Sequence, residues 1–556
     1  MKNKISKIAS VALTLILVGL MCITANASGL SGNGTKTDPY VIETAAQLNE
    51  FSEAVANGNS FSGKFIILAE DIAAAADFSP IGTENAPFSG NFNGNGKTIS
   101  DFDIREDYAG VFAFTDGAVI SDVSVSGEFR ATDYAGAIVA FAKNTSIENC
   151  SISALVYANN YTGGVAGYMK GGKISYCTTQ NKANVGSFAE YCGGIAGYTT
   201  GDITDCTNNA YTYGIKNVGG IAGYSAGNII SCTNTVAVNA TKTNLGGIAG
   251  LTEGTIKYCR NTGKIETTDS DVEMTGGIAG IAYNAAISEC MNNGTVSATG
   301  SFTGGIAGYS KMTIISDCIA TAEVSTSGNY AGGIFGFALE GKTERCVFTA
   351  SVWANEDTKA AIGAIAQGEV ADCYYSSNEE RAVLSGTATN TTALSAAELI
   401  TEASFSSLDL ENTWTINVLH ATYPILVSIP YHSLELSVST EATCTEDGEI
   451  RGICIDCNES IDKVTPAFGH SYMTVSTQAA SCSVDGYRDL LCATCGETET
   501  EILPAKGHSD ANADKECDVC KADITDKQSS DEEKSIFQKI ADFFKSIFEW
   551  IKNLFA

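Results

Sequence analysis

The feature that most limits the fold is a glycine-rich phrase that returns ten times. One copy reads NVGGIAGYSAGNIISCTN at residues 217 to 234, and close relatives of it begin at residues 161 and 302. Successive copies start 26 to 31 residues apart, and their first glycines are Gly110, Gly136, Gly163, Gly193, Gly219, Gly246, Gly276, Gly304, Gly332 and Gly363. A repeat of this period predicts a solenoid, because one copy cannot bury an apolar face alone.

Most copies carry a cysteine about thirteen or fourteen residues after the first glycine, usually as Ile-x-x-Cys, and an aliphatic residue often follows six residues later. Each period therefore holds three short apolar segments separated by turn-forming residues. No proline occurs from Phe88 to Tyr423, as expected where backbone N–H groups are used in strand pairing. We expect an all-β, three-sided parallel β-helix of about ten coils, roughly 50 Å long.

The residue pattern of the repeat resembles that of the GLUG-motif repeats of bacterial surface proteins, over roughly residues 105 to 375. GNGTKTDPYVI at 32 to 42 and FSGNFNGNGKTISDFDI at 88 to 104 are similar to the opening coils of such proteins. The resemblance implies a secreted or surface-exposed β-solenoid, often an adhesive or spacer region and sometimes attached to a protease. The four histidines here form no His-Glu-x-x-His motif of a metalloprotease.

Both ends of a solenoid need a cover, because open strand edges template aggregation. Thr44 to Gln47 and Ser395 to Glu398 each have the pattern of a helical capping box. We expect a helical lid at each end, with Trp414 and the segment 423 to 427 closing the second. The capped solenoid is then predicted to span residues 28 to 430, with its C-terminal cap at 376 to 430.

The N-terminus and the charge restrict the location and the partners. Residues 1–27 have a basic start, an apolar run and a small-x-small end, which is typical of a signal peptide. The formal net charge of −31 disfavours nucleic acid as a ligand. We expect a secreted or cell-surface protein that meets an extracellular glycan or a surface protein.

Two columns of aromatic residues recur at the coil period. Stacked rings could bind sugar rings, or they could pack only on one another, and the sequence leaves both readings open. The candidate ligand-binding residues are Tyr134, Tyr161, Tyr168, Tyr191, Tyr198, Tyr224, Tyr309 and Tyr330. Acidic residues are scattered singly through the repeats, so we expect no catalytic residues, with a polysaccharide lyase or glycosidase as the alternative.

The repeat cysteines are expected to form a structural file of inward thiols that act as small apolar side chains. Vertical disulfides are the alternative, although stacked strands hold side chains farther apart than most disulfides tolerate. Cys192 lies outside this register. The file consists of Cys150, Cys177, Cys206, Cys232, Cys259, Cys290, Cys318, Cys346 and Cys373.

Two cysteine-rich modules follow, at 431–472 and 473–509, with a partial third at 510–525. Both full modules have the spacing Cys-x9-Cys-x2-Cys-x12-His, which suits two structural Zn²⁺ sites. The predicted ligand sets are Cys444, Cys454, Cys457 and His470, and Cys482, Cys492, Cys495 and His508. Disulfides, some of them through Cys517 and Cys520, are the alternative for an exported chain. The modules resemble cysteine-rich repeats near the C-termini of secreted proteins from anaerobic Gram-positive bacteria, and this resemblance implies such a bacterium as the source.

Residues 526–556 are predicted to form a linker and an amphipathic helix. Apolar residues recur at helical spacing from 534 to 556, but charges interrupt the stripe too often for a membrane span. Contact with a membrane surface, a partner or a second copy remains open. Taken together, the sequence favours a non-enzymatic, adhesive β-solenoid.

Overall fold

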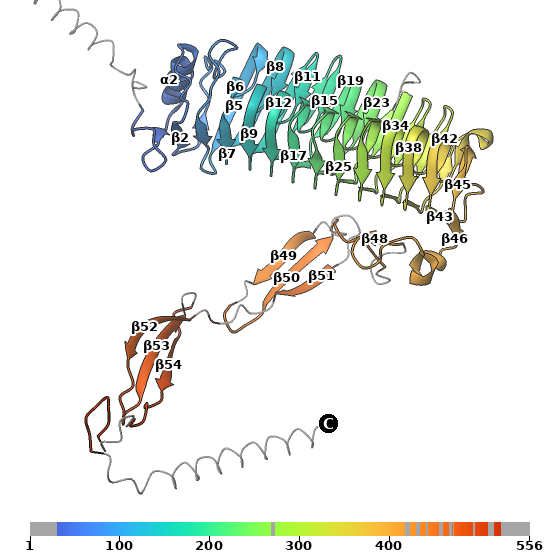
Figure 1. The fold of residues 1–556 in the computed structure, drawn as a ribbon. Helices are drawn as coiled ribbons and strands as arrows, with labels where there is room; N and C mark the ends of the chain where they lie inside the picture. Colours follow the sequence, from blue (N-terminus) through green and yellow to red (C-terminus); the bar gives the residue numbers. More distant parts are fainter. Residues whose placement is uncertain are drawn as a thin grey trace, which may run out of the picture. The chain divides into compact units, whose positions relative to one another are not determined.

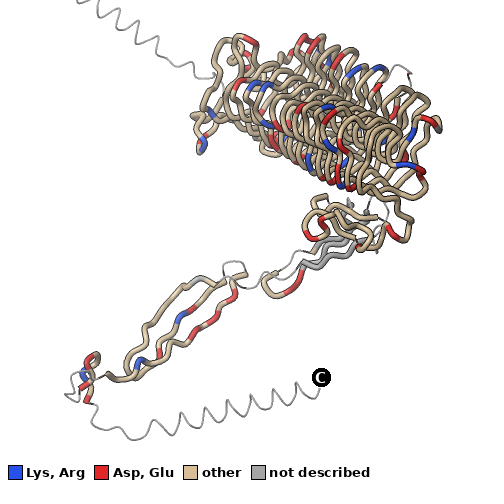
Figure 2. The backbone as a smooth tube through the Cα atoms, turned by 45° about the vertical axis from the view of Figure 1, so that its right-hand side comes forward, with Lys and Arg blue, Asp and Glu red and all other residues tan. Residues whose placement is uncertain are grey.

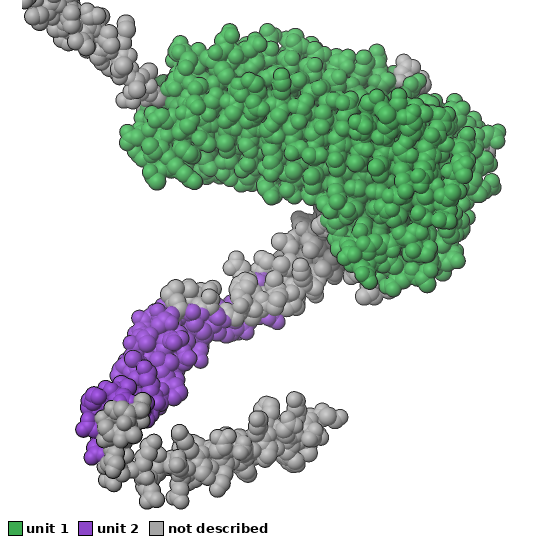
Figure 3. All heavy atoms as spheres, in the orientation of Figure 1, with its two compact units in different colours: residues 1–431 green, residues 432–556 purple. Residues whose placement is uncertain are grey.

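The computed structural model describes residues 30–267, 269, 273–416, 423–429, 434–440, 443–454, 460–465, 470, 472–492, 495–509 and 516–523. The chain divides into two compact units, residues 1–431 and 432–556 (Figure 3). The predicted signal peptide and the predicted C-terminal helix lie outside the described residues.

The first unit is a parallel β-solenoid of about twelve turns (Figure 1). Equivalent strands of successive coils pair in parallel and in register, so that Ile147 lies opposite Ile174, and Ile174 opposite Ile203. The predicted fold is confirmed. The turn count exceeds ten because the opening segments, β1 (Tyr40–Ile42), β2 (Phe65–Leu68) and β4 (Asn91–Asn93), already stack as coils.

One coil shows how the repeat folds. It runs through β15 (Tyr191–Gly193), β16 (Ala196–Thr199), β17 (Asp202–Thr204), β18 (Thr207–Asn208) and β19 (Tyr211–Gly219). Ile203 and Cys206 are completely buried in the interior. Between them Asp205 has a φ of 54°, a left-handed turn conformation that Asp and Asn adopt more readily than most residues.

The glycines of the phrase are required by the close approach of neighbouring coils. A Cβ atom on Gly163 would lie 2.0 Å from the carbonyl oxygen of Ala166 and 2.6 Å from the backbone nitrogen of Gly197 in the next coil. No side chain fits there without displacing backbone.

A file of buried asparagines, which the sequence analysis did not single out, runs inside four coils. Each lies two residues after a file cysteine and is fully buried. Asn234 accepts a hydrogen bond from the Asn208 amide at 2.9 Å and donates one to Asn261 at 2.8 Å, and Asn261 donates to Asn292 at 2.8 Å. Asn234 also donates to the carbonyl of Val236 at 2.9 Å. These amides satisfy one another along the solenoid axis.

The N-terminal lid is the helix expected from the sequence. Helix α2 (Ala45–Ala56) begins after Thr44, whose hydroxyl accepts from the backbone N–H of Gln47 while the Gln47 side chain accepts from the N–H of Thr44. Phe51 of this helix packs edge-on against Phe61 and Phe88 of the opening coils, covering the first end of the core.

The C-terminal cap differs from the predicted helix. The Ser395–Glu398 box forms, since Glu398 accepts from the Ser395 N–H at 2.8 Å, but only two 3₁₀ turns follow, η2 (Glu398–Ile400) and η3 (Glu402–Ser404). The segment then folds back along the flank of the rod, where β47 (Trp414–Thr415) pairs antiparallel with β48 (Ile425–Leu426). Trp414 is fully buried there. Here the residue after the file cysteine is apolar, and the segment buries Met291, Ile319, Val347 and Tyr374.

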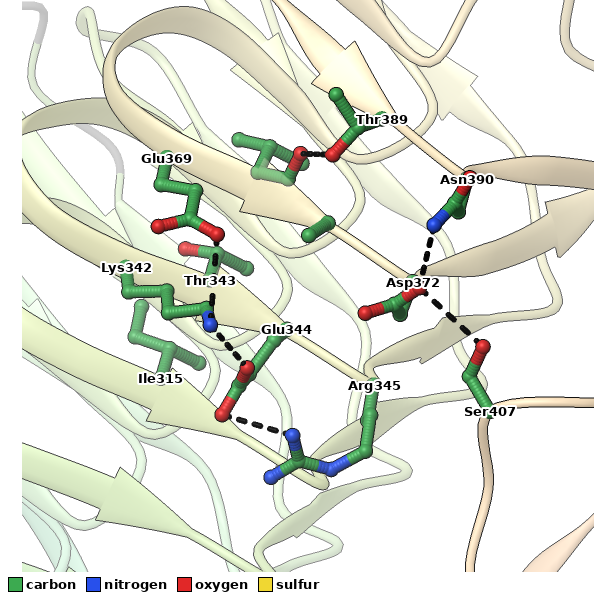
Figure 4. A network of polar contacts seen from close by, with 12 residues as sticks. Ile315, Lys342, Thr343, Glu344, Arg345, Glu369, Asp372, Thr389, Asn390 and Ser407 are labelled. Atoms are coloured by element: carbon green, nitrogen blue, oxygen red, sulfur yellow. Dashed lines mark hydrogen bonds and ion pairs between the residues drawn. The ribbon is translucent and has the colours of Figure 1, made fainter.

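Polar contacts fix this folded-back segment, of which the structure describes residues 395–416 and 423–429 and which we call the strap (Figure 4). Asp372 accepts from the hydroxyl of Ser407 at 3.2 Å and from the amide of Asn390 at 3.2 Å. The indole Nε1 of Trp414 donates to Asp317 at 3.4 Å, and Arg345 pairs with Asp317 at 2.7 Å. The strap thus covers the flank of the last coils.

The second unit contains two antiparallel three-stranded sheets. The first comprises β49 (Leu434–Thr440), β50 (Gly448–Cys454) and β51 (Ser460–Thr465), and the second β52 (Tyr472–Gln478), β53 (Gly486–Cys492) and β54 (Thr498–Leu503). Within the described part of this unit, the buried apolar side chains are those of Cys444, Cys482, Cys492 and Cys517. None of the helices in the described part of the chain has the length and apolarity to cross a membrane.

Candidate metal centres and aromatic files

The first candidate metal centre joins ligands from two successive modules. Cys444 lies in the turn before β50, and His470 lies just before β52, whereas Cys492 and Cys495 come from the end of β53 and the turn after it. All four ligand atoms lie within 4.8 Å of one another. The Sγ atoms of Cys444 and Cys492 are 3.8 Å apart, and Cys495 Sγ is 3.4 Å from His470 Nδ1.

The second centre repeats this arrangement with Cys482, His508, Cys517 and Cys520. Cys482 Sγ lies 3.6 Å from Cys517 Sγ, and Cys520 Sγ lies 3.3 Å from His508 Nδ1. The Cys-x-x-Cys pair is supplied by the partial third module, so that this short segment completes the centre.

These distances fit a tetrahedral metal ion. With Zn–S bonds of about 2.3 Å and Zn–N bonds of about 2.0 Å, tetrahedral angles place two sulfurs about 3.8 Å apart and a sulfur and nitrogen about 3.5 Å apart. A disulfide would require about 2.05 Å between the sulfurs. Two Cys3His clusters could therefore bind metal ions such as zinc.

The surroundings of the ligands support metal binding. Nε2 of His470 lies 3.2 Å from a carboxylate oxygen of Glu497, so the ring nitrogen that faces Cys495 is Nδ1, and a carboxylate behind a ligating histidine is a common outer partner. In the second centre, the backbone N–H of Cys520 and then His508 lower the pKa of the Cys517 thiol to about 5, which favours its thiolate, whereas the contact with Cys517 and then burial raise the pKa of Cys482 to about 11.

The ligand sets expected from the sequence are in part regrouped. Cys444 and His470 do meet, but Cys492 and Cys495 join them, and Cys482 and His508 are completed by Cys517 and Cys520. The side chain of Cys454 and the whole of Cys457 lie outside the described residues. In the second module, Cys492 and Cys495 belong to one cluster and Cys482 to the other, because the strands hold them apart. The spacing of the cysteines in the sequence does not reveal this.

The aromatic residues form two neighbouring files on the rod. In one, the rings of Tyr108, Tyr134, Tyr161 and Tyr191 stack nearly parallel, with centroids 4.9, 4.8 and 5.4 Å apart. In the other, the rings of Phe141, Tyr168, Tyr198 and Tyr224 stack at 4.9, 4.7 and 4.3 Å. The files meet edge to face, as between Tyr161 and Tyr168 at 5.3 Å.

Both files are interrupted and then resume near the C-terminal end. Asn217, Asn244 and Met274 occupy the first file, and Leu251 and Ile281 the second, before aromatic residues return. Tyr330 then stacks on Phe302 at 5.6 Å, and Tyr309 on Phe337 at 5.4 Å. All eight candidate tyrosines are half-buried, and the stacked faces leave mainly ring edges and hydroxyls towards solvent.

The file cysteines are free thiols in the interior. Their Sγ atoms donate to backbone carbonyls, for example from Cys232 to Ile230 at 3.3 Å and from Cys259 to Ile229 at 3.4 Å. Cys192 is also fully buried, beside Val185, and burial raises the pKa of its thiol to about 12.

Comparison with protein-family models gives no match. A stretch of 117 residues is 32% identical to a protein of Evansella cellulosilytica described as "Putative Gly-rich membrane protein". The match covers 19% of this chain and only 13% of that relative's length.

Two solved structures align with most of the chain at low TM-scores. One is the crystal structure of a "putative immunoglobulin A1 protease" from Bacteroides ovatus, at 18% identity and TM-score 0.31, covering 72% of this chain and 95% of that chain. The other is the A-module of the Azotobacter vinelandii mannuronan C-5 epimerase AlgE6, at 11% identity and TM-score 0.33, covering 66% and 99%.

Proposed function

We propose that the protein is a secreted or cell-surface, non-enzymatic adhesive solenoid that binds glycan or protein ligands through a repetitive face of the rod. The observation that carries the proposal is the double aromatic file, in which half-buried tyrosines recur in register over successive coils. Such a surface offers the same ring edge and hydroxyl at each coil, which suits a ligand that is itself a repeat.

The arrangement of charge is compatible with this role. Acidic and basic residues are distributed along the rod (Figure 2). Several of them pair between or within coils, as Lys143 does with Asp116 at 2.7 Å. A net charge of −31 keeps such a chain soluble and disfavours polyanionic ligands.

The remaining parts extend the proposal. We propose that the chain is a GLUG-motif surface protein, because the residue pattern of its repeat resembles that motif. We also propose that residues 1–27 direct its export. Zn²⁺ is the ion proposed for both centres, which would give the modules a fixed form as a spacer. Attachment to a membrane surface or partner through residues 534–556 is proposed from the sequence alone.

The test is a glycan-array screen of the mature protein, run beside a reducing-sugar release assay on the same polysaccharides. We expect binding without release of product. Release of reducing ends or unsaturated sugars would contradict the proposal and favour the alternative, a polysaccharide-degrading enzyme.

A matched pair of variants tests the face. Replacing Tyr161, Tyr168 and Tyr198 together by Phe keeps the stacked rings and removes their hydroxyls, so binding should weaken while stability is kept. Tyr283→Phe removes the hydroxyl of an exposed tyrosine outside both files and should leave binding unchanged. Equal binding by both variants would show that the files are structural only.

A further inference from the structure

A separate group of aromatic side chains lies on the outer face of the rod, on β10 (Ser151–Ala158), β14 (Asn184–Ser187), the segment after it, and β19. In the ladder, Tyr157 lies opposite Gly186 and Gly186 opposite Tyr213, while Tyr211 lies opposite Asn184. Phe188 follows β14 by one residue. We call Tyr157, Phe188, Tyr211 and Tyr213 the Tyr157 platform.

Gly186 makes room for one ring of the platform. A Cβ atom at this position would come within 2.6 Å of Cζ of Tyr213, so the Tyr213 ring extends over the glycine backbone. The ring occupies the space that the side chain of the middle coil would otherwise fill. The Tyr213 ring therefore covers Gly186, which lies between Tyr157 and Tyr213 in the ladder.

The rings of the platform do not stack face to face. Tyr157 and Tyr213 have centroids 6.3 Å apart and are inclined by 53°, and Tyr157 and Phe188 are 6.4 Å apart at 32°. Phe188 is 52% exposed and Tyr211 40% exposed. In the two aromatic files the ring faces are covered by the next coil, whereas here ring surface is left open to solvent.

A polar hollow adjoins the platform. It has a volume of about 380 Å³, and Arg130, one of its lining residues, lies 5.2 Å from the centroid of the Tyr157 ring. The hollow is lined by Arg105, Glu106, Asp107, Arg130, Ala131, Thr132 and Asn159. It offers hydrogen-bond donors and acceptors next to open aromatic surface.

The cations of the hollow are already paired. Arg130 contacts the Glu128 carboxylate, and Arg105 lies 2.9 Å from Asp103 and 3.6 Å from Glu128. The hollow therefore carries no excess positive charge to attract a polyanion, and the chain as a whole is strongly acidic.

We propose that the Tyr157 platform and its hollow bind a neutral polysaccharide. A sugar ring has an apolar C–H face and a rim of hydroxyls. The C–H face matches the open rings, while the rim matches the polar hollow. The inference rests on the proposed adhesive function and deepens it by naming a site and a ligand class.

The experiment uses the mature full chain and soluble neutral polysaccharides, namely a β-glucan, a mannan and a xylan, in affinity electrophoresis or calorimetry. Phe188→Ser and Tyr211→Ser remove the most exposed rings, and their combination should lower affinity about tenfold or more. Trp353→Ser is the matched control, because Trp353 is 60% exposed on β40 (Val352–Trp353) far along the same ladder. It should stay within about twofold of the parent.

The outcomes separate the two proposals. Binding by the parent that both the double variant and the control retain would overturn the platform but leave adhesion standing. Binding by the parent only to alginate-like polyanions or to protein ligands would overturn the ligand class. A parent that binds neither glycan nor protein would overturn the adhesive function and the platform together. Thermal melts of all variants exclude unfolding as the cause of a loss.

Discussion

The rod and the cysteine modules are both built from short strands, but they are held together in different ways. In the rod, neighbouring coils stack buried Ile and Cys side chains in register, and four of the coils add a buried Asn, so that stability accumulates along the ladder. In the described part of the modules, the buried apolar side chains are cysteines that converge on two clusters. Small units without an apolar core need a metal or disulfides to fold.

The largest effect is expected where one ion joins two modules. The double variant Cys444→Ser/Cys495→Ser should lose one of two bound zinc ions per chain, because both residues belong to the same centre. Ligand sets confined to single modules would instead predict the loss of both ions. Elemental analysis of anaerobically purified protein distinguishes a count near one from a count near zero. Cys482→Ser/Cys517→Ser should likewise retain one ion.

The next largest effect concerns the strap. Trp414→Ala removes a fully buried indole and its hydrogen bond to Asp317, which should cost about 3 to 5 kcal/mol of local stability. Limited proteolysis should then cut between residues 395 and 429 while the earlier coils stay protected. Val427→Ala, at an exposed position of the strap, serves as control. An unchanged cleavage pattern would mean that the strap is not anchored by Trp414.

A comparable test addresses the asparagine file. Asn234→Ala leaves the amides of Asn208 and Asn261 without their buried partner, so the free energy of unfolding should fall by about 2 to 4 kcal/mol. Asn228→Ala removes an exposed hydrogen bond to Asp202 and should cost less than about 1 kcal/mol. Chemical denaturation measures both, and similar losses would contradict a special role for the buried file.

The smallest effect is a pH dependence of rod stability to which Cys192 contributes. Burial raises the pKa of Cys192 to about 12, against about 8.5 in an unfolded chain. Above pH 8.5 the unfolded state releases a proton that the folded state keeps, so this contribution is complete below pH 8.5 and is lost as the pH rises. Rod stability should fall between pH 8 and 9.5, and less steeply in Cys192→Ala. Identical slopes would contradict the assignment.

The sequence was most informative where chemistry repeats. The glycines, the Ile-x-x-Cys element and the missing prolines predicted parallel in-register strands, because each position has to match its equivalent one coil away. The capping box at Thr44 likewise predicted α2, since its two hydrogen bonds are local.

Prediction failed where partners are distant in the chain. The strap could have been predicted from the residue that follows each file cysteine, which changes from polar Ser151 and Thr178 to apolar Met291 and Ile319. This change lies in the sequence of the rod and not in that of the strap. The metal centres were regrouped because sheets place a module's Cys-x-x-Cys near the preceding module's cysteine and histidine. The Tyr157 platform depends on Gly186, whose missing side chain has meaning only beside Tyr213.

Hydrogen–deuterium exchange with and without a zinc chelator, in reducing buffer, tests the contrast between rod and modules most directly. We predict that chelation removes backbone protection from β52, β53 and β54 and leaves that of the coils between residues 98 and 376 unchanged. Loss of protection in both units, or in neither, would contradict the proposal that metal ions hold the modules together while files of buried side chains hold the rod.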